Sequence, residues 1–156
     1  MKLTFYDEML RKNLNDYNLT EEQLRFTMAP IRAVEISIND KERFPVVQLN
    51  DDTDIVTFFV LHVGSGVEDY SDNEHAILLR AFSTDARFVG QGYAKNALRL
   101  LPIFVQSNFA YVNEIVLAVD VANEIAKNLY DQAGFIPTNR TTRGRNGEQN
   151  ILKYIL

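Results

Sequence analysis

Hydrophobic positions along the chain follow two different periods, and the change from one to the other marks the elements we expect. Short apolar or alternating runs rich in β-branched and aromatic residues predict strands. Apolar residues that recur every three or four positions predict helices. The predicted strands are 24–28, 44–49, 55–63, 75–83, 114–120 and 150–156, with one further strand before a hairpin turn at 143–149. The predicted helices are 5–17, 30–37, 92–108 and 123–135.

Capping residues support several of these ends. Asn123 is a favoured N-cap and Gly134 a favoured C-terminal stop, which fits a helix between them. Thr20, followed by Gln23, is typical of a cap for another short turn. Strands and helices are mixed in this order, and no repeat or linker interrupts them. The sequence therefore predicts one α/β (α+β) domain over residues 1–156, with a mainly antiparallel sheet.

Composition narrows the classes of protein that remain. Of the 156 residues, 46% are hydrophobic and 24% charged, which is typical of a globular domain. Cysteine is absent, which excludes disulfides, thiolate zinc sites and cysteine nucleophiles, and two histidines leave little material for a metal centre. The net charge of −5 argues against nucleic-acid binding. Without a signal peptide or a membrane-length apolar run, we expect a cytoplasmic protein.

A glycine turn between a predicted strand and a predicted helix is the first candidate for chemistry. Gly90 and Gly92 lead into the helix, whose first N–H groups have no intrahelical partner and suit a phosphate group. A P-loop requires Lys and Ser or Thr after the last glycine, whereas Tyr93 and Ala94 follow Gly92. A dinucleotide fingerprint requires a small residue where the chain has Lys95. Neither of those motifs fits the turn.

Two spaced patterns carry a family resemblance. The first is the turn itself, Val89-Gly90-Gln91-Gly92-Tyr93-Ala94. The second consists of Asn123, Ala126, Leu129, Tyr130, Gly134 and Phe135. Together they resemble the GNAT superfamily of acyl-coenzyme A dependent N-acetyltransferases. Its pyrophosphate loop usually reads Gln/Arg-x-x-Gly-x-Gly/Ala, so Val89 departs from the family at the basic position. A register shifted to Arg87 would restore a basic residue but would start the helix too early.

The resemblance implies a fold and a co-substrate. In that family the fourth and fifth strands splay apart, here 75–83 and 114–120, and the pantetheine arm of acetyl-coenzyme A lies between them. Amides from Val89 to Ala94 would hold the pyrophosphate, and Asn123 would bind the arm. The backbone groups that would pair with pantetheine belong to Phe82, Ser83 and Thr84.

The resemblance also implies direct attack of a primary amine on the thioester, in a ternary complex. Tyr130 would be the general acid that protonates the departing thiolate. A carboxylate, acting through water, would remove a proton from the amine, and Glu74 is the candidate, with His75 behind it. No metal is expected. Arg80 interrupts an apolar strand and, without a bulge, would share a face with Glu74 and Phe82, so it must find a partner or line a site.

Several alternatives stay open. The acceptor is a small-molecule amine or a protein amine. Residues 50–75 hold seven acidic residues and no Lys or Arg, which would favour a cationic amine if these turns rim the site. A non-catalytic acyl-coenzyme A binding or regulatory domain is the alternative to an enzyme. A ligand-free interaction domain is the third class. A homodimer formed through edge strands is expected, with no nucleic-acid or membrane partner.

Overall fold

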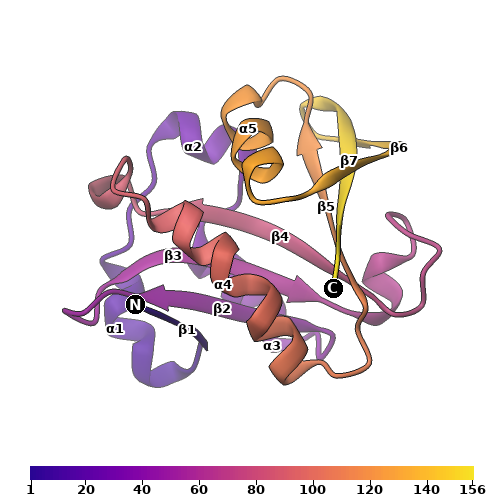
Figure 1. The fold of residues 1–156 in the computed structure, drawn as a ribbon. Coiled ribbons are helices and arrows are strands. Elements are labelled where there is room, and N and C mark those ends of the chain that lie inside the picture. Colours follow the sequence, from indigo (N-terminus) through magenta and orange to yellow (C-terminus); the bar gives the residue numbers. More distant parts are fainter.

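The computed structural model describes residues 1–156 as one seven-stranded sheet with helices on both faces (Figure 1). The strands are β1 (Lys2–Phe5), β2 (Arg43–Leu49), β3 (Ile55–His62), β4 (Ala76–Thr84), β5 (Glu114–Asp120), β6 (Ile136–Gly144) and β7 (Gly147–Ile155). Their order in the sheet is β1-β2-β3-β4-β5-β7-β6. Only β4 and β5 pair in parallel. The predicted mixed, mainly antiparallel sheet is thereby confirmed.

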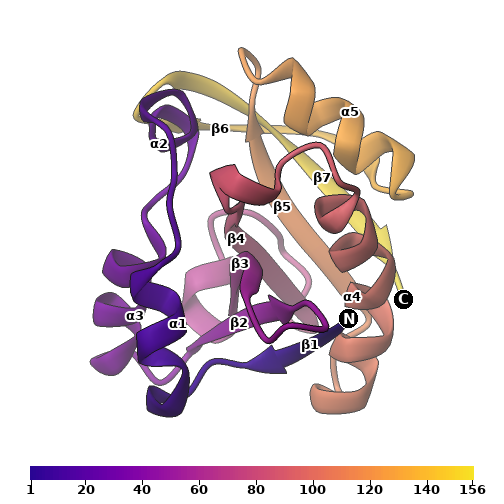
Figure 2. The same cartoon turned by 90° about the vertical axis from the view of Figure 1, so that its left-hand side faces the viewer.

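The helices form two layers around the sheet. They are α1 (Arg11–Asn15), α2 (Glu21–Phe26), α3 (Pro30–Ile38), α4 (Tyr93–Asn108) and α5 (Glu124–Gln132), with 3-10 turns at Glu8–Leu10, Gly64–Val67 and Ala86–Phe88. Figure 2 shows α1, α2 and α3 on one face and α4 and α5 on the other. None of these helices has the length and apolar character that crossing a membrane requires.

Each helical layer covers its own hydrophobic core, and β3 contributes to both. Phe59 packs with Leu98 and Leu101 of α4, whereas Phe58 packs with Leu14 of α1 and Val34 of α3. Successive side chains of a strand point to opposite faces. All of β3 is therefore buried, which explains why its sequence is continuously apolar.

The N-terminal region departs from the sequence prediction in two places. Residues 24–28 do not form a strand, because α2 occupies Glu21–Phe26. Thr20 and Gln23 form a reciprocal capping box there, as the cap pattern predicted, and an extended stretch then leads to Pro30. Apolar and polar residues alternate over 24–28 as they would in a strand, but no neighbouring strand pairs with this segment.

The predicted helix 5–17 is partly wrong as well. The chain begins with β1, which pairs with β2 through Lys2–Phe5, and only Arg11–Asn15 is α-helical. Phe5 joins the core under α4, whereas Leu14 joins the core under α3. Their apolar spacing suggested one amphipathic helix, but the two side chains serve opposite faces of the sheet.

A β-bulge changes the direction of the side chains along β4. Ser83 pairs with Phe58 and Arg80 with Val60, so the register shifts between them, and Ala81 adopts a positive φ of 56°. Arg80 consequently lies on the α1–α3 side while Phe82 packs against Phe59 under the other layer. The expectation that Arg80 and Phe82 share a face assumed no bulge and is wrong.

Candidate active site

Strands β4 and β5 pair only at their beginnings. The ladder joins Ala76–Leu78 to Glu114–Val116 and then stops. Beyond it β4 continues beside β3, and β5 continues beside β7. Figures 1 and 2 show the two strands diverging. We call the unpaired region between 79–84 and 117–120 the wedge; the splay expected for the fourth and fifth strands is present.

The glycine turn lies where β4 leads into α4. Gly90 and Gly92 have φ of 84° and 85°, and a side chain built at either position would meet no atom within 4 Å. None of the amides from Gly90 to Lys95 donates a hydrogen bond to a protein acceptor. Gly92 is the N-cap and offers no side chain to these donors. The turn thus presents free N–H groups at the positive end of a 16-residue helix.

Buried polar contacts fix the position of this turn. Asp85 is fully buried and accepts hydrogen bonds from the backbone N–H and the guanidinium of Arg87. Arg87 therefore pairs with Asp85 and helps to hold the turn in place. On the first turn of α4, Asn96 accepts from Gln48 at 2.8 Å, and Gln48 in turn accepts from Thr57 at 2.6 Å. The start of α4 is therefore tied to β2 and β3 by side chains buried beneath it.

The end of β4 is less open than the sequence suggested. The Ser83 carbonyl accepts a hydrogen bond from the Tyr17 hydroxyl at 2.8 Å, and the Thr84 carbonyl accepts one from Gln23 at 2.8 Å. Phe82 alone among the three predicted pantetheine contacts has no side chain on its backbone groups. The short N-terminal helices thus reach the edge that the strand exposes.

Asn123 and Tyr130 lie on α5 at the other border of the wedge. The Asn123 side-chain oxygen accepts from the Ala126 N–H at 3.2 Å, which leaves its NH₂ group without a protein partner. Tyr130 is 8% exposed, and its ring meets those of Phe82 and Phe135 edge-on at 6.1 and 5.8 Å. Burial raises the pKa of the Tyr130 phenol, and no hydrogen bond opposes that effect.

Glu74 and His75 are not brought together with these groups. Both are exposed in the turn that precedes β4, at the paired end of the β4–β5 ladder. With a rise of about 3.3 Å per residue, Glu74 lies roughly 30 Å along the strand from Thr84.

Asp120, which the sequence predictions did not include, is 7% exposed and ends β5 on the face of Ala118. Its carboxylate accepts from Gln149 at 3.0 Å and from Asn146 at 3.3 Å.

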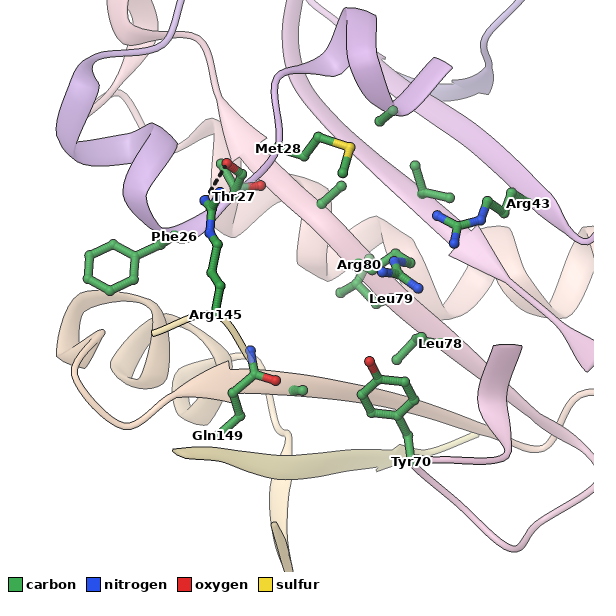
Figure 3. Close-up of a pocket in the computed structure, with 14 residues that line it drawn as sticks. Phe26, Thr27, Met28, Arg43, Tyr70, Leu78, Leu79, Arg80, Arg145 and Gln149 are labelled. Carbon is green, nitrogen blue, oxygen red and sulfur yellow. Dashed lines mark hydrogen bonds between the residues drawn. The ribbon is translucent and has the colours of Figure 1, made fainter. Parts of the chain in front are cut away.

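A cavity of about 260 Å³ lies on the opposite side of the wedge, beneath α2 and α3. It is bordered by Leu78 to Ala81 of β4, by Ala118 of β5 and by Gln149 of β7, and so spans the gap between the strands. Figure 3 shows Arg43, Arg80 and Arg145 around this space. No acidic side chain lines it; from the acidic segment 50–75 only Val60 and Tyr70 belong to the lining.

The three arginines are held in different ways. Arg43 forms an ion pair with Asp40 at 3.0 Å. Arg145, in the β6–β7 turn, donates to the carbonyls of Leu24 and Thr27 at the end of α2. The side-chain NH₂ group of Asn146 donates a hydrogen bond to the Arg25 carbonyl at 2.6 Å. These bonds fasten the hairpin to α2 and close one wall of the cavity.

Arg80 contacts His62 instead of a carboxylate. One guanidinium nitrogen lies 3.2 Å from His62 Nδ1. Burial lowers the pKa of His62, and the charges of Arg43 and Arg80 lower it further. At neutral pH the imidazole is therefore uncharged and accepts the hydrogen bond. No group of His, Asp and Glu side chains in the structure is arranged to hold a metal ion.

Comparisons with known proteins agree with this geometry. Residues 6–135 match the Acetyltransferase (GNAT) family. The Bacillus subtilis (strain 168) protein YbbJ, named an uncharacterized N-acetyltransferase, is 40% identical over 157 residues, covering 100% of this chain and 98% of the relative. The aminoglycoside acetyltransferase AAC(6′)-Ib with coenzyme A and kanamycin has a TM-score of 0.73 at 15% identity, over 98% of this chain and 93% of that one.

The fold also matches a spermidine N-acetyltransferase from Vibrio cholerae, solved with coenzyme A and spermine. The TM-score is 0.72 at 12% identity, covering 99% of this chain and 94% of the other. Two lines of sequence similarity and the splayed sheet therefore agree. The chain belongs to the GNAT acetyltransferase family.

Proposed function

We propose that this protein transfers an acetyl group from acetyl-coenzyme A to a small primary amine by direct attack. The observation that carries the proposal is the position of the wedge, which has free amides of the glycine turn at one side and a cavity at the other. The similar structures support it, because they are aminoglycoside and spermidine acetyltransferases solved with coenzyme A and an amine.

The residues of the turn fit a pyrophosphate group. The space next to Gly90 and Gly92 is open, and the amides from Gly90 to Lys95 are unpaired donors. Val89, at 58% exposed, adds no polar contact. The backbone groups of Phe82, which no side chain occupies, are assigned to the pantetheine arm, and the Asn123 NH₂ group supplies a donor. When bound there, the coenzyme would supply a thioester carbonyl as the electrophile.

The bulge in β4 and Tyr130 have complementary tasks in this mechanism. A bulge leaves backbone groups outside the ladder, and we assign the stabilisation of an oxyanion at the wedge to N–H groups of Ala81 and Phe82. Tyr130 is the proposed general acid. The phenol is uncharged at neutral pH, and although burial raises its pKa and so weakens it as an acid, it can donate a hydrogen bond to the sulfur and pass on its proton as the thiolate leaves.

The proton of the incoming ammonium group needs an acceptor on the cavity side. We assign this role to Asp120, whose carboxylate is buried and lies two residues beyond Ala118, about 7 Å along β5. Glu74 is the weaker candidate because it is exposed at the far end of β4. Asp120→Asn should lower turnover and change the pH–rate profile, while Glu74→Gln should leave both unchanged; the reverse result would restore Glu74.

A thiol-release assay with acetyl-coenzyme A and a panel of amines tests the reaction. Thermal-shift binding of coenzyme A is measured in parallel. Release that depends on one class of amine establishes the enzyme. Binding without release from small amines or amine-bearing peptides favours the regulatory alternative, and absence of binding rejects the assignment of the turn.

Two further proposals concern the protein's setting. We place the reaction in the cytoplasm, where acetyl-coenzyme A is made and used. A homodimer is also proposed, because the outer edge of β6 pairs with no strand and much of β6 is exposed. Sedimentation tests the dimer: a mass near 17.9 kDa would contradict it.

A further inference from the structure

The cavity beneath α2 and α3 has an unbalanced charge. Of its three arginines, only Arg43 forms an ion pair, with Asp40. Arg145 is held by carbonyl groups, and Arg80 by the neutral imidazole of His62. Asp120 accepts hydrogen bonds from the lining residue Gln149 and from Asn146 and forms no ion pair. Neither Arg80 nor Arg145 forms an ion pair; Asp40 acts on Arg80 only across the imidazole of His62, whose Nε2 lies 3.7 Å from the Asp40 carboxylate.

Arg80 is the more unusual of the two. It occupies a strand position whose neighbours Leu78 and Leu79 are almost completely buried. Burial lowers the pKa of its guanidinium, as does the proximity of Arg43, and the charge of Asp40 offsets this only in part. Burying a charge is unfavourable unless a partner of opposite charge compensates. The direct partner of Arg80 is His62, with the Asp40 carboxylate behind it at 3.7 Å, so the guanidinium itself contacts no carboxylate.

Other features of the cavity suit a small polar ligand. The Thr27 hydroxyl oxygen is buried and has no hydrogen-bond partner. Thr27 borders the same cavity as Arg145 and Gln149, as Figure 3 shows. A volume of about 260 Å³ is close to the lower end of ligand sites and accommodates a molecule the size of an amino acid. Arg80 stands next to the bulge, so a ligand held by it lies beside the wedge.

Building on the acetyl transfer proposed above, we propose that the acceptor is a small primary amine that carries an anionic group, bound by the guanidinium of Arg80 with Arg145 opposite. A carboxylate and a phosphate share the required chemistry, because both accept paired hydrogen bonds from a guanidinium. The amine of such a molecule points into the wedge, toward the thioester position. Polyamines and other polycations are excluded by the same charges.

Matched acceptors test the preference directly. We would compare kcat/KM for leucine, leucinamide and 3-methylbutylamine, which share a side chain and differ at the carboxylate, and for phosphoethanolamine against ethanolamine. An amino-acid amide has the more acidic ammonium group, so intrinsic reactivity favours the amide. A preference for leucine identifies a carboxylate, and one for phosphoethanolamine a phosphate. Equal or better use of the uncharged partners, or of spermidine, overturns the proposal.

Substitution of Arg80 identifies the residue responsible. Arg80→Met should lower kcat/KM for the anionic acceptor by about 10- to 100-fold, the cost of losing a charged hydrogen bond, with little effect on its neutral analogue. Arg80→Lys should restore part of the preference. Arg140→Met is the matched control, since Arg140 pairs with the exposed Asp72 outside the cavity and should change neither value. Equal losses for both acceptors would indicate a merely structural role and reject the assignment.

A binding measurement separates this inference from the proposed reaction. With coenzyme A present, N-acetylleucine, N-acetylleucinamide and N-acetylphosphoethanolamine are added, and the melting temperature is recorded. Stabilisation by an anionic compound alone, lost in Arg80→Met and kept in Arg140→Met, supports the anion site even if no amine releases thiol. Thiol release from amines with no response to any anionic compound keeps the enzyme and rejects the anion site.

Discussion

The two sides of the wedge are built in different ways. On the side of α4 and α5, the binding groups are backbone amides of one short turn, together with side chains of one nearby helix. On the side of α2 and α3, the cavity is lined by side chains from β2, β4, the end of α2 and the β6–β7 turn. The first site is local in sequence, and the second depends on segments more than 100 residues apart.

This difference explains how a common reaction can be combined with different acceptors. Backbone donors need only glycines and a helix start, so the coenzyme side tolerates a departure such as Val89. The charge of the other side depends on a few side chains, chiefly Arg80 and Arg145, which can change without disturbing the turn. Experiments that affect one side and spare the other therefore test the division.

The largest effect is expected from Gly92→Val. A side chain at φ 85° strains the backbone and projects into the space beside the free amides, so coenzyme A binding should weaken by at least about 100-fold. Gly147→Val is the control, because Gly147 has φ 103° and equally open surroundings in the β6–β7 turn. Both variants should lose about 1–3 kcal/mol of stability. Calorimetry showing unchanged affinity in Gly92→Val would reject the turn as the binding site.

Tyr130→Phe comes next. Removal of the hydroxyl should lower turnover by about ten- to a thousandfold while coenzyme A still binds, because only a proton donor is lost. Tyr154→Phe is matched to it, since Tyr154 packs on the same Phe135 ring at 5.5 Å. Steady-state rates and calorimetry measure the two effects. Equal turnover in wild type and Tyr130→Phe would show that another acid acts.

A smaller effect is expected on the pH dependence of stability, through His62 on the cavity side. The pKa of His62 is lower in the folded protein than its ordinary value of 6.5, so the unfolded chain takes up the proton first on acidification. Stability from this group is complete above pH 6.5 and is lost as pH falls toward the folded pKa. Urea unfolding between pH 7 and 5 should show a shallower pH dependence in His62→Gln than in wild type. His75→Gln, in an exposed turn, should retain the wild-type slope; a slope unchanged in both variants would contradict the neutral His62.

The smallest expected effect is a gain. Val89→Arg should tighten coenzyme A binding by about two- to fivefold at low salt, since an exposed ionic contact contributes at most about 1 kcal/mol. Ile103→Arg adds the same charge on an exposed position of α4 and should leave affinity unchanged. Equal gains in both variants would indicate a general effect of net charge instead of a contact at the turn.

The sequence predictions were accurate where local pattern determines the structure and failed where distant contacts determine it. The strands at 44–49, 55–63, 75–83 and 114–120 agree with β2 to β5 within one residue at every end, because each is long, apolar and largely buried. The stretch 24–28 was misread because its alternation was short and the capping box of α2 determined its structure. Strand β1 was missed because its four residues are stabilised by pairing with β2, a contact that no local pattern displays.

The sequence by itself determined the glycine turn and the family resemblance, because both depend on short motifs, and the resemblance in turn implied the splayed strands. Only the tertiary structure decided the charge of the cavity. Arg43, Arg80 and Arg145 meet there because the sheet, its bulge and the β6–β7 turn bring them around one space. The acidic residues outnumber the basic ones by 21 to 16 but contribute no side chain to its lining, and the field of a site depends on the few charges that reach it.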